Sequence, residues 1–326
     1  MNVYIVGAGA VGTYLGAKLQ RSGNSVIYAP RDTATVEPVD ADLAIIAVKS
    51  YQTDSAIATL RRALRNPGAT TIVTPQNGVG NEEKLAAVFG ADTVVAAALT
   101  TPIGLDKDGQ GVAARGGGMV FAPVGSNSTH NWLLAAFGAT GIPVSAAADY
   151  RSLKWSKLAL NVVGNASCAI LNVLPERLVH LDDVFSLEIR AIREVRAVMK
   201  ALDIPAIDLP RYPVRALQGI ASLPAPLARI VLANRVAGAR GRKPPSLLLD
   251  LRAAKNRTEV DVLNGAVAAA ARRAGVSAPV NTVFARVVSD IAAMPQLWAK
   301  YRERPDALEA EVQAEVVRRS RTVAAT

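Results

Sequence analysis

Residues 3–16 read VYIVGAGAVGTYLG. A short apolar run of strand type leads into a G-x-G-x-x-G motif, and an apolar pattern with helical spacing follows it. The first glycine makes the tight turn off the strand, the second lets a pyrophosphate approach the backbone, and the third lets the helix pack close to the strand. The N–H groups at the start of that helix then face the phosphates. The cofactor-binding residues expected here are Gly7, Gly9, Ala10, Val11 and Gly12.

The surrounding pattern favours a nucleotide site over an ordinary glycine-rich turn. Strands are expected at 25–29, 42–48, 70–74, 94–99 and 142–146, and helices from just after Gly12 to about Ser22, at 53–64 and at 132–137. Residues 112–114 and 119–123 are expected to form a hairpin. From Asp149 onward the pattern is nearly all helical. We predict an α/β fold, with a Rossmann-type doubly wound sheet in a cofactor-binding domain at 1–147 and an all-helical substrate or catalytic domain at 148–326.

Composition narrows the class of protein. The chain has 326 residues, of which 50% are hydrophobic, and a formal net charge of +10. No apolar run approaches the ~18 residues of a membrane span, and no signal peptide is expected. The basic residues are scattered without interleaved aromatics, so we expect a small anionic substrate and a phosphorylated cofactor, with no nucleic acid and no membrane as partner. The single cysteine, Cys168, is expected in the core and suits a cytoplasmic protein.

No spacing of His, Cys, Asp and Glu typical of a metal site is present, so no metal is expected. The sequence leaves the oligomeric state open, with a homodimer as one alternative.

The end of the second strand bears on cofactor choice. Folds that bind NAD usually place an acid about 20 residues beyond the glycines, where it holds the ribose 2′-OH. Here the first charge is Arg31, whose guanidinium suits a 2′-phosphate. Asp32 is either the acid displaced by a few positions or a turn residue. The pattern favours NADP(H), although only about ten residues join Arg31 to the next strand at Asp42.

Polar side chains follow two further strands of the expected sheet. Lys49 ends the strand at 42–48, and Asn77-Gly78 follows the strand at 70–74. The carboxyl ends of such strands face the cofactor crevice, so both side chains are candidates for binding cofactor or substrate. A solvated lysine and an Asn-Gly turn are the alternatives. Asn81 is expected to cap the next helix, with Glu82 and Glu83 in its first turn.

A helix expected over residues 153–166 carries the strongest chemical pattern. Lys157, Asn161 and Asn165 are spaced four residues apart, so on one helix they form a polar row. The rest of the helix is mostly apolar, and unpaired buried polar groups cost about 1–3 kcal/mol each. The row therefore lines a wet cleft or pairs with protein groups, and we favour the cleft. Lys154, one turn earlier, is the rival lysine.

Two stretches of the second domain resemble helix starts. Ser246 follows two prolines and is interpreted first as an N-cap. Residues 258–261 read TEVD, a capping-box form that places Glu259 in the first turn of a helix.

The combined pattern resembles the ketopantoate reductase family. The matching stretches are Gly7-x-Gly9-x-x-Gly12, Arg31, Ala47-Val48-Lys49, Asn77-Gly78, Trp155-x-Lys157-Leu158 with Asn161 and Asn165, and Ser246 with Asp250, Thr258-Glu259-Val260-Asp261 and Asn264-Gly265. They follow the family's order over almost the whole chain.

The resemblance implies reduction of 2-dehydropantoate (ketopantoate) to pantoate by NADPH, a step of pantothenate and coenzyme A biosynthesis. It implies Lys157 as the general acid, with Lys49 and Asn77 in the cofactor and substrate sites. It also implies that Asn161, Asn165, Ser246 and Glu259 bind substrate, with Glu259 helping to keep Lys157 charged. A reductase of another branched 2-oxo acid and a non-catalytic NADP-binding sensor remain the alternatives.

Overall fold

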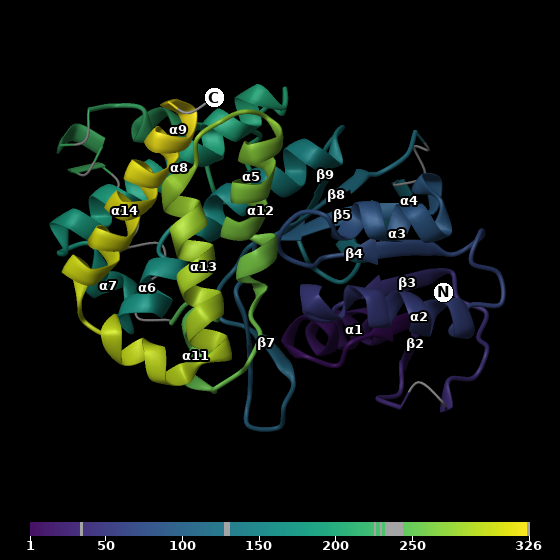
Figure 1. The fold of residues 1–326 in the computed structure, drawn as a ribbon. Helices are drawn as coiled ribbons and strands as arrows, with labels where there is room; N and C mark the ends of the chain where they lie inside the picture. The colour runs from purple at the N-terminus through teal and green to yellow at the C-terminus, as the bar shows by residue number, and fades with distance from the viewer. Residues whose placement is uncertain (33–34, 127–130, 225, 229, 232–243, 325–326) are drawn as a thin grey trace. The chain divides into compact units, whose positions relative to one another are not determined.

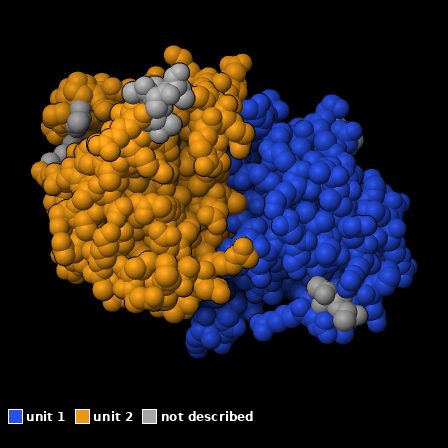
Figure 2. Space-filling view, in the orientation of Figure 1, with its two compact units in different colours: residues 1–157, 207–212 blue, residues 158–206, 213–326 orange. Residues whose placement is uncertain are grey.

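The computed structural model describes residues 1–32, 35–126, 131–224, 226–228, 230–231 and 244–324 (Figure 1). The chain divides into two compact units, which Figure 2 colours separately. Unit 1 comprises Met1–Lys157 and Ile207–Tyr212, and unit 2 comprises Leu158–Ala206 and Pro213–Thr326. The expected domain boundary was residue 147, whereas the compact unit extends to Lys157 and takes in a second, distant segment.

Unit 1 is built on a parallel-dominated sheet. Its strands are β1 (Asn2–Val6), β2 (Ser25–Tyr28), β3 (Leu43–Ile46), β4 (Thr71–Thr74), β5 (Val94–Leu99), β6 (Ile103–Leu105), β7 (Gly111–Ala113), β8 (Met119–Pro123) and β9 (Val144–Ala146). Its helices are α1 (Ala10–Arg21), η2 (Ser50–Gln52), α2 (Thr53–Ala63), α3 (Asn81–Phe89), η3 (Ala91–Thr93) and α4 (Asn131–Gly138). Among the described residues, the large sheet has the order β2-β1-β3-β4-β5-β8-β9. Strands β1 to β5 run parallel, and β8 is antiparallel to β5.

Both faces of this sheet are buried. Alternate residues of a strand point to opposite faces, so Val3 and Ile5 of β1 join one hydrophobic cluster, and Tyr4 and Val6 join another. The first cluster includes side chains of α1 and α4, and the second includes side chains of α2 and α3. Helices therefore cover both faces, and the prediction of a doubly wound sheet is confirmed (Figure 1).

The expected hairpin of residues 112–114 and 119–123 is wrong. Strand β7 pairs instead with β6, through Ile103 opposite Ala113, and β8 joins the large sheet beside β5. Local sequence favours a hairpin across nearby glycines. The apolar β8 instead buries both of its faces in the sheet, as its near-complete burial shows.

Unit 2 is helical, as predicted. Its elements are α6 (Ala166–Leu171), α7 (Pro175–Leu178), α8 (Asp182–Ala201), α9 (Val214–Ala221), α11 (Ser246–Arg252), η4 (Glu259–Val262), α12 (Asn264–Arg273), α13 (Pro279–Ala293), η5 (Pro295–Lys300) and α14 (Pro305–Ala324). A continuous core joins α6, α8, α11, α13 and α14. Cys168 lies fully buried in this core, as expected, and the Trp298 indole N–H donates to the carbonyls of Ala169 and Ile170.

The helix expected over 153–166 is interrupted. Helix α5 (Tyr150–Val162) ends before Gly164, and α6 begins at Ala166. Gly164 adopts φ +59°, and its N–H donates to Glu188 Oε2 at 2.5 Å rather than continuing the helix. Lys157 and Asn161 therefore share one helix, but Asn165 does not continue their polar row.

None of the described helices is long and apolar enough to cross a membrane. Within the same residues, no group of three or more His, Cys, Asp or Glu side chains is arranged to hold a metal ion.

Candidate active site

The glycine motif of unit 1 forms a turn in which Gly7 and Gly12 leave no room for a side chain. Gly7 has φ +111°, and a Cβ there would lie 2.7 Å from Val48 N. A Cβ on Gly12 would lie 1.9 Å from Gly7 O, so α1 packs directly on the turn. A Cβ on Gly9, by contrast, would meet nothing within 4 Å. The chain thus leaves open space beside Gly9, which fits the approach of a pyrophosphate to the backbone.

The start of α1 presents backbone donors next to that space. The helix begins at Ala10, and its first turn closes with the bond from Thr13 N to Gly9 O at 2.9 Å. The N–H groups of Ala10, Val11 and Gly12 precede this bond and resemble the anion-binding end of a helix. Thr13 Oγ1 also accepts from Gly111 N at 2.8 Å, which fixes β7 against α1. These features fit a bound dinucleotide.

Arg31 lies beyond the end of β2, where the sequence predicts the ribose of the cofactor. The N–H of Ala29 donates to Ile5 O at 2.8 Å, so the chain remains attached to β1 up to this point. The Arg31 side chain is exposed, as is Asp32. Thr35 Oγ1 donates to Asp32 O at 2.9 Å, so Asp32 takes part in a local turn.

A buried polar network joins the ends of β3 and β4, where Lys49 and Asn77 lie. The side-chain amide of Gln76 donates to Val48 O and to Thr53 Oγ1, both at 3.0 Å. Thr53 Oγ1 in turn donates to Ser50 O at 2.8 Å. Because Val48 and Ser50 flank Lys49, and Gln76 precedes Asn77, this network holds the two candidate residues on neighbouring strand ends. Both side chains are half-buried.

Asn81 has a different role from the expected N-cap. The cap position is Gly80, in the left-handed conformation with φ +99°, and Asn81 is the first residue of α3. Its side chain points into the polar network: Oδ1 lies 3.0 Å from Thr53 Oγ1, and Nδ2 donates to Asn77 O at 3.2 Å. A buried partner therefore outcompetes the local capping preference.

Lys154 is buried at the same edge of the sheet. Its side chain is 2% exposed, and Nζ lies 2.8 Å from Glu82 Oε1, whose side chain is 1% exposed. Nζ also donates to Gln76 O at 2.5 Å and to Ala97 O at 3.5 Å. Burial raises the pKa of Glu82, and the Lys154 charge opposes that rise. The sequence pattern gave no sign of this pairing, since Glu82 suited a helix N-terminus by itself.

Two further contacts fix the start of α5. Asp149 Oδ2 accepts from Ser152 N at 2.8 Å and from Ser152 Oγ at 2.6 Å. Tyr150 Oη donates to Glu83 Oε1 at 3.3 Å, and burial, with the Glu83 charge, raises the Tyr150 pKa to about 12. The hydroxyl therefore remains protonated at neutral pH and serves as a donor.

Lys157 follows on the same helix. It lies one turn beyond Lys154, is half-buried, and is the last residue of unit 1. Asn161, one turn further along α5, is also half-buried. Unit 1 thus brings together the glycine turn, Lys49, Asn77 and the helix of Lys157 at the carboxyl edge of the sheet.

In unit 2 the structure brings Asn165 and Ser246 together. Asn165 is buried, and its Oδ1 accepts from Leu247 N at 3.2 Å. Ser246 is the first residue of α11, and the N-cap is Pro245, so the expected Ser246 cap is wrong. Asn165 supplies the side-chain acceptor at this helix start, which leaves the half-buried Ser246 hydroxyl with no capping duty.

Glu259 lies in the turn η4. Thr258 is its N-cap, as predicted, and accepts from Val260 N at 3.3 Å, but η4 is a short 3-10 turn and the α-helix begins only at Asn264. Glu259 is buried. The following residues are fixed through Asn264, whose Nδ2 donates to Asn281 Oδ1 at 2.9 Å.

A buried carboxylate, that of Glu194, holds the helix to which Asn281 belongs. Glu194 of α8 accepts from the N–H groups of Val280 and Asn281, both at 2.9 Å, and so caps the first turn of α13. Burial raises the Glu194 pKa, and these bonds oppose the rise. The sequence did not single out Glu194 or Asn281.

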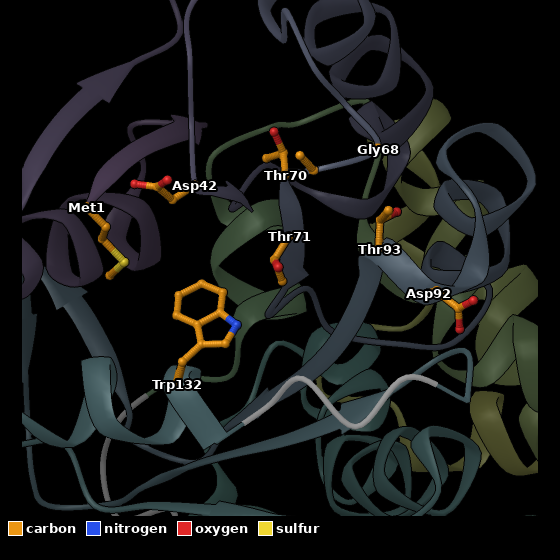
Figure 3. Close-up of a pocket in the computed structure, with 9 residues that line it drawn as sticks. Met1, Asp42, Gly68, Thr70, Thr71, Asp92, Thr93 and Trp132 are labelled. Atoms are coloured by element: carbon orange, nitrogen blue, oxygen red, sulfur yellow. The ribbon is translucent and has the colours of Figure 1, made fainter.

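A cavity of about 470 Å³ lies at the opposite, amino edge of the sheet (Figure 3). Its lining residues are Met1, Asp42, Gly68, Ala69, Thr70, Thr71, Asp92, Thr93 and Trp132. Its carboxylates already serve the fold, since Asp42 accepts from Asn2 N at 2.7 Å and Asp92 from Ser126 N at 3.0 Å. No predicted site residue lines it. Ligands of open α/β sheets bind outside the carboxyl ends of the strands, and this cavity lies at the other edge.

Comparison with known proteins covers both units. The family described as ketopantoate reductase PanE/ApbA matches residues 3–40 and 27–126, and its C-terminal part, ketopantoate reductase PanE/ApbA C terminal, matches residues 149–292. The 2-dehydropantoate 2-reductase of Pyrococcus horikoshii is 25% identical over 311 residues, which cover 86% of this chain and 94% of that protein.

Solved structures agree on the fold. The PanE/ApbA family ketopantoate reductase from Ralstonia eutropha JMP134 is 27% identical, with a TM-score of 0.74 over 91% of this chain and 100% of that one. The ternary structure of D-mandelate dehydrogenase with NADH and anilino(oxo)acetate also has a TM-score of 0.74, over 90% and 98% of the two chains, and its 18% identity supports the fold alone. Together with the glycine turn and the helical second unit, the family matches establish that this chain belongs to the ketopantoate reductase family of oxidoreductases.

Proposed function

We propose that this protein reduces 2-dehydropantoate to pantoate with NADPH, as a cytoplasmic step of pantothenate biosynthesis. One structural observation gives the proposal its main support. The helix of Lys157 is attached to the edge of the sheet at which the glycine turn lies, through the bond from Lys154 Nζ to Gln76 O. Gln76 directly precedes Asn77, so Lys157 and Asn77, two residues of the family pattern, are connected through this bond within unit 1.

Lys157 is proposed as the general acid. When bound, the nicotinamide supplies a hydride to C2 of the 2-oxo acid. Negative charge develops on the carbonyl oxygen, and the Lys157 ammonium stabilises it and delivers its proton there, which yields the hydroxyl of the product. Lys49 and Asn77 are proposed to bind cofactor and substrate from unit 1.

Unit 2 is proposed to bind the substrate through polar side chains. Asn161 and Ser246 are candidates to hold the carboxylate and the hydroxyl, and Glu259 to accept from a hydroxyl. Asn165 is proposed to orient Ser246, because its Oδ1 accepts from the N–H of the next residue, Leu247.

NADPH is proposed over NADH because Arg31 follows β2 where an acid usually holds the ribose. An exposed guanidinium can bind a 2′-phosphate bidentately. The Asp32 position, in a turn closed by Thr35, supports its interpretation as a turn residue. We expect the kcat/KM with NADPH to exceed that with NADH, and Arg31→Ala to abolish most of this preference by weakening NADPH binding by about tenfold or more.

The decisive experiment follows NADPH absorbance with ketopantoate and a panel of branched 2-oxo acids. Wild type is expected to prefer ketopantoate by kcat/KM. Lys157→Ala is expected to lose about 10²–10⁴ in kcat, because positioned acid catalysis contributes that much. Lys200→Ala, at an exposed lysine near the end of α8, is the matched control and should retain wild-type kinetics.

Three outcomes would contradict parts of this proposal. Full activity of Lys157→Ala would remove Lys157 as the acid. A higher kcat/KM for another 2-oxo acid would identify the alternative substrate. A melting temperature raised by NADPH, with no turnover on any 2-oxo acid, would identify the non-catalytic NADP-binding protein instead.

A further inference from the structure

The Lys154 ammonium lies among protein oxygens inside unit 1. A lysine ammonium has three N–H groups, and Nζ faces three acceptors: Glu82 Oε1 at 2.8 Å, Gln76 O at 2.5 Å and Ala97 O at 3.5 Å. The side chain is 2% exposed. The buried Lys154 ammonium is thus occupied by contacts within the protein, whereas Lys157, one turn away, is half-buried.

The three acceptors belong to three different elements. Gln76 follows β4, Ala97 lies in β5, and Glu82 lies in the first turn of α3. Lys154 therefore connects the start of α5 to two neighbouring strands and one helix. Among these contacts the one with Gln76 O is closest to the chemistry, because the next residue is Asn77.

The network beyond Gln76 extends this connection to the end of β3. The Gln76 amide donates to Val48 O at 3.0 Å, directly before Lys49. Asn81 Nδ2 donates to Asn77 O at 3.2 Å, which holds the same loop from its other side. A displacement of α5 would thus change the positions of Lys157 and Asn77 with respect to each other, while Lys49 and Asn77 stay linked.

We propose that Lys154 is a positioning residue for the reduction: its bond to Gln76 O fixes α5, and with it Lys157, in register with Asn77, while Glu82 neutralises the buried charge. This inference rests on the proposed function. It assigns to the rival lysine a geometric role and leaves the proton transfer to Lys157.

The proposal predicts that the effect of Lys154 on protein stability can be separated from its effect on kcat. Lys154→Met leaves the buried Glu82 carboxylate without its ion-pair partner, which is strongly destabilising. The double variant Lys154→Met/Glu82→Met removes both charges with side chains of similar length, and such replacements are often neutral for stability. The double variant still lacks the bond to Gln76 O. Glu82→Gln, by contrast, keeps Lys154 and its main-chain bonds.

The experiment measures melting temperature, kcat and KM on the full chain. The double variant is expected to regain most of the melting temperature lost in Lys154→Met, yet to keep a kcat about 10- to 100-fold below wild type, since small misplacements of catalytic groups cost rates of this size. KM for NADPH should stay near wild type. Glu82→Gln is expected to melt lower than wild type and to lose less kcat than the double variant.

Lys84→Met is the matched control: Lys84 lies on α3, as Glu82 does, and the change removes an exposed ion pair with Asp54 of α2. It should change neither kcat nor KM. A double variant with wild-type kcat would overturn the proposal, and so would a kcat that follows the melting temperature through all variants, because both results would make the pair merely structural. If the double variant does not fold, the Glu82→Gln variant decides the question. A kcat of Glu82→Gln as low as that of Lys154→Met would also overturn the proposal.

A second measurement does not depend on any substrate. The rate at which an amine-reactive reagent labels Lys157, followed by peptide mass spectrometry, reports the surroundings of that ammonium. We expect at least a several-fold change in this rate in the double variant, with the exposed Lys200 as internal reference. An unchanged labelling rate in the double variant would overturn the positioning role of Lys154. Inactivity of the wild type on every 2-oxo acid would defeat the proposed function, and the labelling result would still decide the positioning role.

Discussion

Gly9 and Gly12 lie three residues apart in one motif, but the absence of a side chain has a different physical reason at each position. Gly12 is required by the protein itself, because a Cβ there would collide with Gly7 O at 1.9 Å. Gly9 has an ordinary φ of −86° and open space around its missing Cβ. The fold would therefore tolerate alanine at Gly9, and the open space is of use only to a ligand.

These glycines give a matched pair of alanine variants. Gly9→Ala is expected to keep or slightly raise the melting temperature, because alanine restricts the unfolded chain by about 0.4–1 kcal/mol. It should weaken NADPH binding by about tenfold or more, since the methyl group occupies the space of the pyrophosphate. Gly12→Ala is expected to lose about 1–3 kcal/mol of stability through overpacking. Calorimetry with and without NADPH measures both, and a Gly9→Ala variant with unchanged affinity would place the pyrophosphate elsewhere.

Among whole elements, α14 has one carboxylate that joins it to both α13 and η5. Glu311 accepts from Lys300 Nζ at 2.5 Å, from Arg286 at 2.6 Å and from Tyr301 Oη at 3.0 Å. Arg286 belongs to α13, and Lys300 to η5. The bond from Lys300 is the largest cause, with those from Arg286 and Tyr301, that holds the Glu311 pKa down to about 2.

This lowered pKa predicts a loss of stability in acid. A carboxyl group with a folded-state pKa below its unfolded value of 4.5 stabilises the fold above that value, and the contribution is lost as pH falls toward about 2. The two cationic partners, Arg286 and Lys300, are about half exposed, so solvent screening limits the loss to about 1–2 kcal/mol. Urea unfolding at neutral pH and at about pH 3 should show that Glu311→Gln narrows this pH dependence.

Glu309→Gln provides the control on the same helix, because Glu309 makes no ion pair with any residue in the described part of the chain. It should leave the acid dependence of the wild type intact. If the free energy of unfolding falls equally with decreasing pH in wild type and Glu311→Gln, the three contacts contribute nothing to stability in solution.

For the molecule as a whole, the division into units does not follow the order of the chain. Residues 207–212 belong to unit 1 although about fifty residues of unit 2 precede them. Ser156 Oγ accepts from Ile207 N at 2.9 Å, and Arg115 donates to Tyr212 Oη at 3.1 Å. The segment is therefore attached to unit 1 at both of its ends.

Two fully buried serines test this attachment. Ser156→Ala removes the acceptor of the Ile207 N–H and is expected to cost about 1–3 kcal/mol. Ser167, equally 0% exposed, has an Oγ without a hydrogen-bond partner among the described residues, so Ser167→Ala should be neutral or stabilising. Chemical denaturation of both variants measures the difference. Equal effects would show that the Ile207 bond does not hold the segment.

Local sequence foretold most of the elements and part of the site. Apolar runs and periodicity predicted β1 to β5, α1, α2 and the helical second unit, because burial of one helix face or of whole strands leaves a direct trace in the chain. The glycine turn was predicted for the same reason, since each glycine answers to a local demand. The pairing of β7 with β6 was missed because strand partners are chosen by tertiary packing, which nearby glycines do not reveal.

What the sequence by itself determined is the family, the glycine turn and the residue types at the strand ends. Only the tertiary structure decided that Lys154 pairs with Glu82, that Gly164 ends α5 before Asn165, and that Asn165 contacts the start of α11. Each of these depends on a partner more than twenty residues away in the chain. The physical reason is burial. A charged or polar group removed from water needs a hydrogen-bonding or ionic partner, and the fold can supply that partner from a distant part of the chain, so the spacing of residues in the sequence does not reveal it.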